Sequence, residues 1–138
     1  MLRVVFDTNV LVSALIKTGK PRELWRKVLD KKLRSITSTQ IVNELEEVLR
    51  RPKFSSYVDV GDIQKFVDEV SRVSEFVEIA SKFNVIKEDM ADNIILSCAH
   101  DDKADCIVSG DEHLLALKGF KGIKIVAAGE LLRGLTSA

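Results

Sequence analysis

Residues 4–12, VVFDTNVLV, decide the fold predicted for this chain. The apolar residues 4–6 are typical of a buried strand, and the strand runs into the carboxylate of Asp7 and the amide of Asn9. Residues 106–111, CIVSGD, repeat this pattern late in the chain and end at Asp111. In open α/β sheets, ligands bind in the crevice outside the carboxyl ends of the parallel strands. Two strands that each lead to an aspartate therefore predict an acidic pocket at that edge of a sheet.

Helical and strand patterns alternate along the rest of the chain. Apolar residues at helical spacing predict helices over residues 10–16, 21–29, 41–49, 62–74, 91–100, 112–117 and 129–132. Further strands are predicted over residues 33–37, 76–79, 105–109 and 123–126. Strands separated by helices pair in parallel through right-handed crossovers, with helices on both faces. The sequence therefore predicts an α/β fold, a three-layer α/β/α sandwich with a central parallel sheet, and a helical excursion over residues 51–74.

Length and composition set the class of protein. A chain of 138 residues with 46% hydrophobic residues has the size and core of one ordinary domain, so we expect a single domain over residues 1–138. No apolar run approaches the roughly 20 residues that cross a bilayer, and Asp7 interrupts any signal-peptide pattern. We therefore expect a soluble, cytoplasmic protein without a membrane partner. Cys98 and Cys106 lack CxxC spacing and are expected to be buried core side chains.

The charge is balanced overall but unevenly distributed. The formal net charge is zero, which argues against bulk attraction to nucleic acid. Residues 1–60 carry 12 Lys and Arg against 7 Asp and Glu, a net +5, whereas residues 61–138 carry 9 against 14, a net −5. Such a basic segment suits contact with a phosphate backbone, although an ordinary solvated helix face explains it equally well. The candidate RNA-binding residues are Lys17, Lys20, Arg22 and Arg26.

Four carboxylates do not fit a solvated surface. Asp7 and Asp111 follow strands, whereas Glu44 and Asp92 lie at the edges of apolar helix faces. Burying a lone carboxylate costs several kcal/mol unless a partner compensates it, and the sequence places no arginine near all four. The alternatives are a cap or turn for Asp7 and exposed helix flanks for Glu44 and Asp92.

A divalent cation would compensate these carboxylates together. Mg²⁺ and Mn²⁺ prefer oxygen ligands and bind through a few carboxylates together with the phosphates of a substrate. With only His100 and His113 in the chain, a histidine-rich zinc site is not expected. Oxygen ligands without histidine favour phosphate chemistry, in which a metal activates water and neutralises developing charge.

The ordered set of motifs resembles the PIN domain family. It comprises FDTNVLVSA at residues 6–14, IVNELEEVL at 41–49, ADNIIL at 91–96 and VSGD at 108–111. The nearest likeness is to small single-domain PIN proteins, including the VapC-type toxins of toxin–antitoxin pairs. The resemblance implies a Mg²⁺- or Mn²⁺-dependent endoribonuclease with a homodimeric state and a cognate antitoxin that covers the pocket. It assigns metal binding and catalysis to Asp7, Glu44, Asp92 and Asp111, and supporting hydrogen bonds to Asn9 and Ser109.

The chain departs from the family pattern at one position. Related sequences often have a second acid two residues after the fourth aspartate, where this chain has His113. This departure leaves open whether one or two metal ions bind. Asp89 and Glu88 precede Asp92 closely and are alternatives to it as the third ligand.

Other classes fit the sequence less well. A phosphoacceptor receiver domain needs paired acids after the first strand and a lysine after the last, but Asp7 has no acidic neighbour and Lys124 lies within the strand. A haloacid-dehalogenase-like phosphatase needs Asp-x-Asp at the first strand end, whereas this chain has Asp7-Thr8-Asn9. The sequence also has no P-loop, which argues against a nucleotide-driven activity. A PIN fold that binds RNA or a protein without cutting stays open because of His113.

Overall fold

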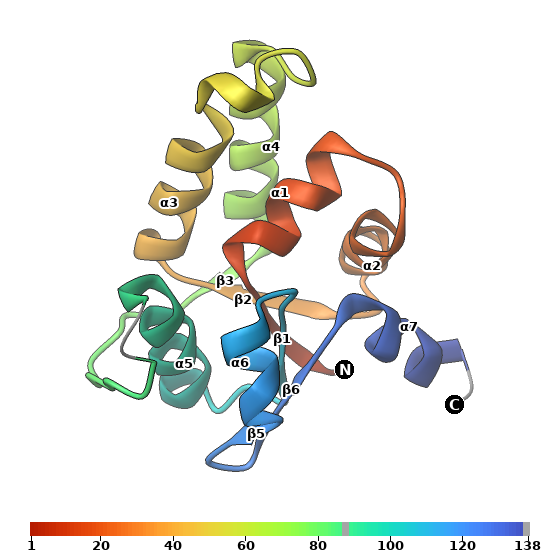
Figure 1. Cartoon of the computed structure of the whole chain (residues 1–138). Coiled ribbons are helices and arrows are strands. Elements are labelled where there is room, and N and C mark those ends of the chain that lie inside the picture. Colours follow the sequence, from red (N-terminus) through yellow and green to blue (C-terminus); the bar gives the residue numbers. More distant parts are fainter. Residues whose placement is uncertain (87–88, 137–138) are drawn as a thin grey trace.

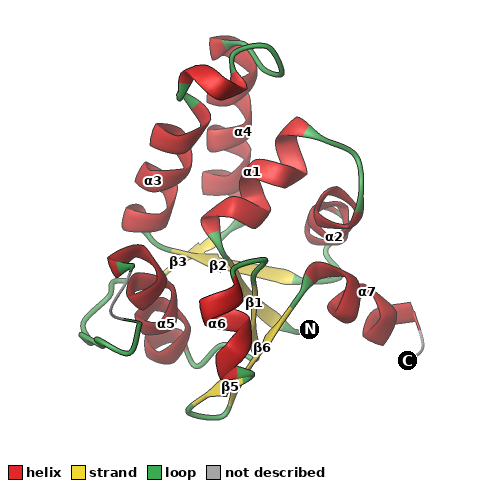
Figure 2. Cartoon of the chain, viewed as in Figure 1, coloured by secondary structure: helices red, strands yellow, loops and turns green. Residues whose placement is uncertain are grey.

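The chain folds around one six-stranded sheet. Its structure is a computed structural model that describes residues 1–86 and 89–136. The strands are β1 (Arg3–Phe6), β2 (Arg34–Thr37), β3 (Glu75–Phe76), β4 (Cys106–Val108), β5 (Gly119–Phe120) and β6 (Ile123–Val126). Their order is β3-β2-β1-β4-β6-β5, and every neighbouring pair is parallel except β5 with β6 (Figure 2). At the centre, Val5 pairs with Ile36 and Ile107, and all three side chains are buried.

Helices cover both faces of this sheet. They are α1 (Thr8–Ile16), α2 (Lys20–Leu29), α3 (Thr39–Leu49), α4 (Val60–Val73), α5 (Met90–Asp102), α6 (Glu112–Leu117) and α7 (Ala128–Thr136), with a 3₁₀ turn at Pro52–Phe54. Helices α1 to α4 lie on one side of the sheet and α5 and α6 on the other, while α7 packs beside α2 (Figure 1). The arrangement confirms the predicted three-layer α/β/α fold, with a mostly parallel sheet.

Caps and apolar spacing explain where the helices begin and what they bury. Ser38 accepts a hydrogen bond from the Ile41 N–H at 3.2 Å and so starts α3, and Pro52 prevents its continuation. Asp59 and Asp62 form a capping box that starts α4 at Val60, two residues before the predicted start.

Aromatic contacts join the sheet to the helices on the α1–α4 face. Trp25 packs edge to face against Phe6 and Phe66, with ring centroids 5.6 and 5.9 Å apart, and so connects α2 with β1 and α4. Its indole N–H donates to Glu69 at 2.8 Å, which satisfies the polar end of a buried ring.

The structure differs from the predicted elements in short or terminal segments. Strand β3 covers residues 75–76 instead of 76–79, because the following chain turns toward α5, where Asp101 accepts bonds from the Ala80 and Ser81 N–H groups. Strand β5 was not predicted, and it pairs antiparallel with β6 through a turn in which Lys121 and Gly122 have positive φ. Helix α7 is longer than predicted because it packs along α2.

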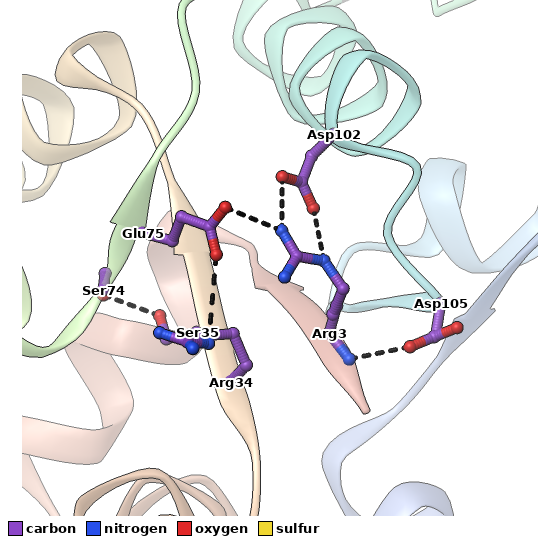
Figure 3. Close-up of polar contacts among 7 residues, drawn as sticks. All are labelled: Arg3, Arg34, Ser35, Ser74, Glu75, Asp102 and Asp105. Carbon is purple, nitrogen blue, oxygen red and sulfur yellow. Dashed lines mark hydrogen bonds and ion pairs between the residues drawn. The ribbon is translucent and has the colours of Figure 1, made fainter. Parts of the chain in front are cut away.

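The amino-terminal edge of the sheet is held by a balanced ion network (Figure 3). The Arg3 guanidinium donates to Asp102 at 2.6 and 3.0 Å and to Glu75 at 2.9 Å, and the Arg3 N–H donates to Asp105 at 2.8 Å. Arg34 lies 3.9 Å from Glu75 in a second ion pair. Because Arg3 bonds to it, the pKa of Glu75 is lowered. Glu75 and Asp102 are therefore paired with arginine side chains, whereas Asp105 accepts only a backbone N–H.

The two cysteines lie in the core, as the sequence predicted. Cys98 and Cys106 are free and buried, and burial raises their pKa values to about 12 and about 11, so both are unreactive core side chains. Among residues 1–86 and 89–136, none of the helices combines the length and hydropathy needed to cross a membrane.

Candidate functional site

The sheet topology brings Asp7 next to the end of β4. Strand β1 lies between β2, which follows it in the chain, and β4, so the strand order reverses at the β1–β4 boundary. Such a topological switch point leaves a crevice at the carboxyl ends of the strands. The Asp7 N–H donates to the Val108 carbonyl at 2.9 Å, which fixes the two strand ends together. Asp7 is 5% exposed, so its carboxylate lies at the floor of this crevice.

Ser109 connects two of the acids. Its hydroxyl donates to Oδ2 of Asp7 at 2.7 Å and accepts a hydrogen bond from the Asp111 N–H at 2.9 Å. Asp111 in turn caps α6, because its Oδ1 accepts from the N–H groups of His113 and Leu114 at 2.8 and 3.2 Å. One hydroxyl therefore holds Asp7 and Asp111 at a fixed spacing.

Glu44 and Asp92 enter the same site from helices on opposite faces of the sheet. Burial raises the pKa of Glu44 on α3, and the charges of Asp7 and Asp89 raise it further. Burial also raises the pKa of Asp92 on α5, to about 7, with added contributions from Asp111, Asp89 and Asp7. The pKa of Asp7 is raised by its burial and then by Asp111. These mutual effects place all four predicted acids, together with Asp89, in one electrostatic cluster.

This cluster differs from the Arg3 network at the other edge of the sheet in having, among the described residues, no cation in an ion pair with its carboxylates. The charges that raise the pKa values of Asp7, Glu44 and Asp92 all belong to carboxylates, whereas Arg3 offsets the acids around β3. Uncompensated carboxylates destabilise a fold, so their presence at the switch point indicates a functional site.

The donor set fits a hard divalent cation, although a complete ligand set is not preformed. Oδ2 of Asp92 is buried and has no hydrogen-bond partner, which is the state expected of an oxygen whose partner is a bound ion. In the part of the chain that the structure describes, no three His, Cys, Asp or Glu side chains form a group that could hold a metal ion. The four oxygen-bearing side chains have the chemistry that Mg²⁺ and Mn²⁺ require.

A cavity of about 530 Å³ opens beside Asp111, whereas Asp7, Glu44 and Asp92 do not line it. Asn9 and Ser13 of α1 line one wall, and Ser109 and Asp111 line the wall facing them. The predicted supporting residues therefore have different positions. Ser109 is buried and bonds directly to Asp7, whereas Asn9 is exposed at the cavity wall, where it can contact a substrate.

The alternative third ligand Asp89 lies beside Asp92. Asp89 caps α5 by accepting a hydrogen bond from the Ala91 N–H at 2.9 Å, and its charge acts on both Glu44 and Asp92. Glu88, the other alternative, lies outside the described residues. The His113 side chain is exposed, and the backbone N–H of His113 donates to the Asp111 side chain that caps α6.

Sequence reasoning missed the function of Asn93. Its Oδ1 accepts from the Val85 and Ile86 N–H groups, both at 2.9 Å, and its Nδ2 donates to the carbonyls of Ile86 and Asp89 at 2.6 and 3.3 Å. Asn93 is 2% exposed, so a buried amide fixes the loop that leads to Asp89. An amide among the mostly apolar residues 91–99 is the signal that could have revealed it.

The four predicted RNA-binding residues separate into different environments. Lys20 and Arg26 line a cavity between α2 and α7, and Lys17 is exposed at the end of α1. Arg22 instead donates to the carbonyls of Ala14 and Leu15 at 3.0 and 2.7 Å, which ties α2 to the last turn of α1. Arg22 therefore satisfies helix-terminal carbonyls within the fold.

These features define an α/β domain with a carboxylate pocket at its switch point, and comparison with known proteins gives its family. A sequence model of the PIN domain matches residues 3–113, and the chain belongs to this family. It is 32% identical over 119 residues to the uncharacterized protein MJ1680 of Methanocaldococcus jannaschii, covering 85% of this chain and 76% of that protein.

Two crystal structures are similar in fold. PAE2754 from Pyrobaculum aerophilum superimposes with a TM-score of 0.66 at 16% identity, over 100% of this chain and 91% of the other. VapBC2 from Rickettsia felis, solved bound to a DNA fragment from its promoter, gives a TM-score of 0.62 at 16% identity, over 90% of this chain and 97% of the other. At this level of identity the likeness supports the fold.

Proposed function

We propose that this chain is a Mg²⁺- or Mn²⁺-dependent endoribonuclease. The observation that carries the proposal is the cluster of Asp7, Glu44 and Asp92, whose pKa values are raised by burial and by neighbouring carboxylates. Membership of the PIN domain family supports nuclease activity on a nucleic acid. The finer assignment to RNA follows from the motifs that resemble small PIN ribonucleases.

Each side chain has a distinct task in this proposal. Asp7, Glu44, Asp92 and Asp111 would hold the cation, which when bound neutralises charge that develops on the attacked phosphate and activates water. The Ser109 hydroxyl orients the Asp7 carboxylate through its bond of 2.7 Å, and burial prevents that carboxylate from rotating into solvent. Asn9 contacts the substrate from the cavity wall.

Partners and location form a second part of the proposal. The fold similarity to VapBC2 supports a cognate antitoxin that covers the acidic cavity, and the resemblance to VapC-type toxins supports a homodimer in the cytoplasm. Light scattering of the purified chain at several concentrations tests the dimer, because a monomer at every concentration would contradict it.

A catalytically inactive PIN fold that binds RNA or a protein is the second candidate. Two observations favour it, namely the lack of a preformed three-ligand group within residues 1–86 and 89–136 and the exposed His113 side chain where relatives often have an acid.

Cleavage assays separate the two candidates. The purified protein is incubated with structured and single-stranded RNA in Mg²⁺, in Mn²⁺ and in EDTA. We expect cleavage that EDTA abolishes and that Asp7→Asn lowers by at least about a hundredfold, because metal-site and electrostatic groups contribute on this scale. Asp68→Asn makes the same chemical change on the exposed face of α4 and should cleave normally. RNA binding without metal-dependent cleavage would favour the inactive fold.

A further inference from the structure

A second cavity, of about 420 Å³, lies between α2 and α7, the two helices side by side in Figure 1. Its lining is dominated by cations from both helices. Lys20, Arg26 and Lys27 come from α2 and Arg133 comes from α7, against the carboxylates of Glu23 and Asp30. The α2 residues alone, three cations against two carboxylates, give the lining a formal charge of +1.

The α2 cations are not neutralised within the fold. Across the described ranges, Lys20, Arg26 and Lys27 have no carboxylate within 4.0 Å, whereas Arg3, Arg34 and Arg50 each form an ion pair. Cations that line a concave surface without internal partners concentrate positive potential there. This surface therefore suits an anionic ligand.

The basic cavity adjoins the acidic one. Pro21 and Ala128 line the cavity beside Asp111, and their chain neighbours Lys20 and Gly129 line the basic cavity. Gly129 allows this close arrangement, because a side chain there would come within 2.8 Å of the Lys20 Cδ atom. The Lys20 stem thus lies against the start of α7, where the two cavities meet.

We propose that the α2–α7 cavity binds the sugar–phosphate backbone of the nucleic acid strand whose scissile phosphate occupies the acidic site. The inference rests on the proposed function, because it assumes that the acidic cavity receives the same strand. A polyanion entering a pocket of carboxylates needs cations nearby, and Lys20, Arg26 and Lys27 supply them next to that pocket. Contacts to phosphates carry no sequence information, so this cavity positions the strand without selecting its bases.

Binding in EDTA tests this cavity separately from cleavage. Fluorescence anisotropy with a labelled single-stranded RNA of about 12 nucleotides gives the affinity between about 50 and 200 mM salt, because single-strand sites span this length range. The test variant is Lys20→Gln/Arg26→Gln/Lys27→Gln. The control variant is Lys32→Gln/Lys65→Gln/Arg72→Gln, which removes the same charge from exposed positions outside this cavity.

The slope of log K against log salt is negative, and each lost phosphate contact should make it less negative by about 0.7. The loss of three contacts should therefore make it less negative by about 2. Over the fourfold salt range, the wild-type affinity should therefore fall about 20-fold more than that of the test variant. Each single substitution should make the slope less negative by about 0.7, and the control should keep the wild-type slope. A DNA strand of equal length should show the same change, because the cavity reads phosphates.

Three results would overturn the inference. They are an unchanged slope in the test variant, an equal loss in the control, and loss of RNA affinity that does not depend on salt. Because binding is measured without metal, a protein that fails to cleave RNA but shows the expected slope change would refute the nuclease proposal, and only backbone binding by the α2–α7 cavity would remain supported. Circular dichroism of each variant confirms that the fold is retained.

Discussion

The Ser109 hydroxyl gives the most specific prediction about how the acidic site is held. It is 1% exposed, donates to Asp7 at 2.7 Å and accepts from the Asp111 N–H at 2.9 Å. Ser109→Ala removes both bonds without adding volume. A hydrogen bond to a charged group contributes about 1.5–3 kcal/mol, so we expect a loss of this size in the free energy of unfolding.

The loss should depend on pH in a defined direction. The Ser109 bond stabilises the ionised form of Asp7, so removing it raises the pKa of Asp7 further above its already raised value. The destabilisation is therefore larger at about pH 8, where Asp7 is ionised, than near pH 5, where more of it is protonated.

Urea denaturation followed by Trp25 fluorescence at both pH values in EDTA measures this difference. Ser35→Ala is a matched control, because the buried Ser35 hydroxyl bonds to Ser74 at the same 2.7 Å with no charge involved. We expect the control to cost about 0.5–1.5 kcal/mol equally at both pH values. A Ser109→Ala cost no larger than that of the control, and independent of pH, would refute the reasoning.

Two further predictions concern the same site. As the pH rises from about 4 to about 7, the metal-free protein should become less stable, because the raised pKa values of Asp7, Glu44 and Asp92 make the folded state bind more protons than the unfolded state. Thermal midpoints measured in EDTA should therefore fall as the pH rises, and less steeply in Asp92→Asn. Midpoints that rise with pH would contradict the raised pKa values. Asn93→Ala removes four hydrogen bonds to Val85, Ile86 and Asp89 and should lower the free energy of unfolding by about 1–3 kcal/mol, with faster hydrogen exchange at the Val85 amide. Unchanged exchange would show that these bonds do not hold this segment.

The location of the site could be predicted from the sequence because strand topology determines it. The apolar strands that end at Asp7 and Asp111 pair in parallel, and parallel neighbours have their carboxyl ends at the same edge. The placement of Glu44 and Asp92 near this edge could be predicted because both lie at the border of apolar helix faces, and these faces must pack against the sheet. Local pattern and global fold agree at these four positions.

The hydrogen bonds within the site could not be predicted in the same way. Whether Asn9 or Ser109 bonds to Asp7 depends on the side-chain directions in the first turn of α1 and after β4, and the sequence patterns do not encode them. Arg22 was predicted to contact RNA, which stays a prediction, and the sequence pattern did not show that its guanidinium donates to the carbonyls at the end of α1. Strand β5 was missed because residues 119–120 are too short for a detectable alternation.

Separate chain segments bring four carboxylates together, and we propose that these side chains share a hard dication. Titration of the metal-free protein with Mn²⁺, followed by the paramagnetic resonance of the free ion, measures this most directly. We predict binding by the wild type and by Asp68→Asn, and affinities lower by at least about tenfold for Asp7→Asn and Asp92→Asn. No binding by the wild type, or equal binding by all four proteins, would show that these carboxylates do not share a metal ion.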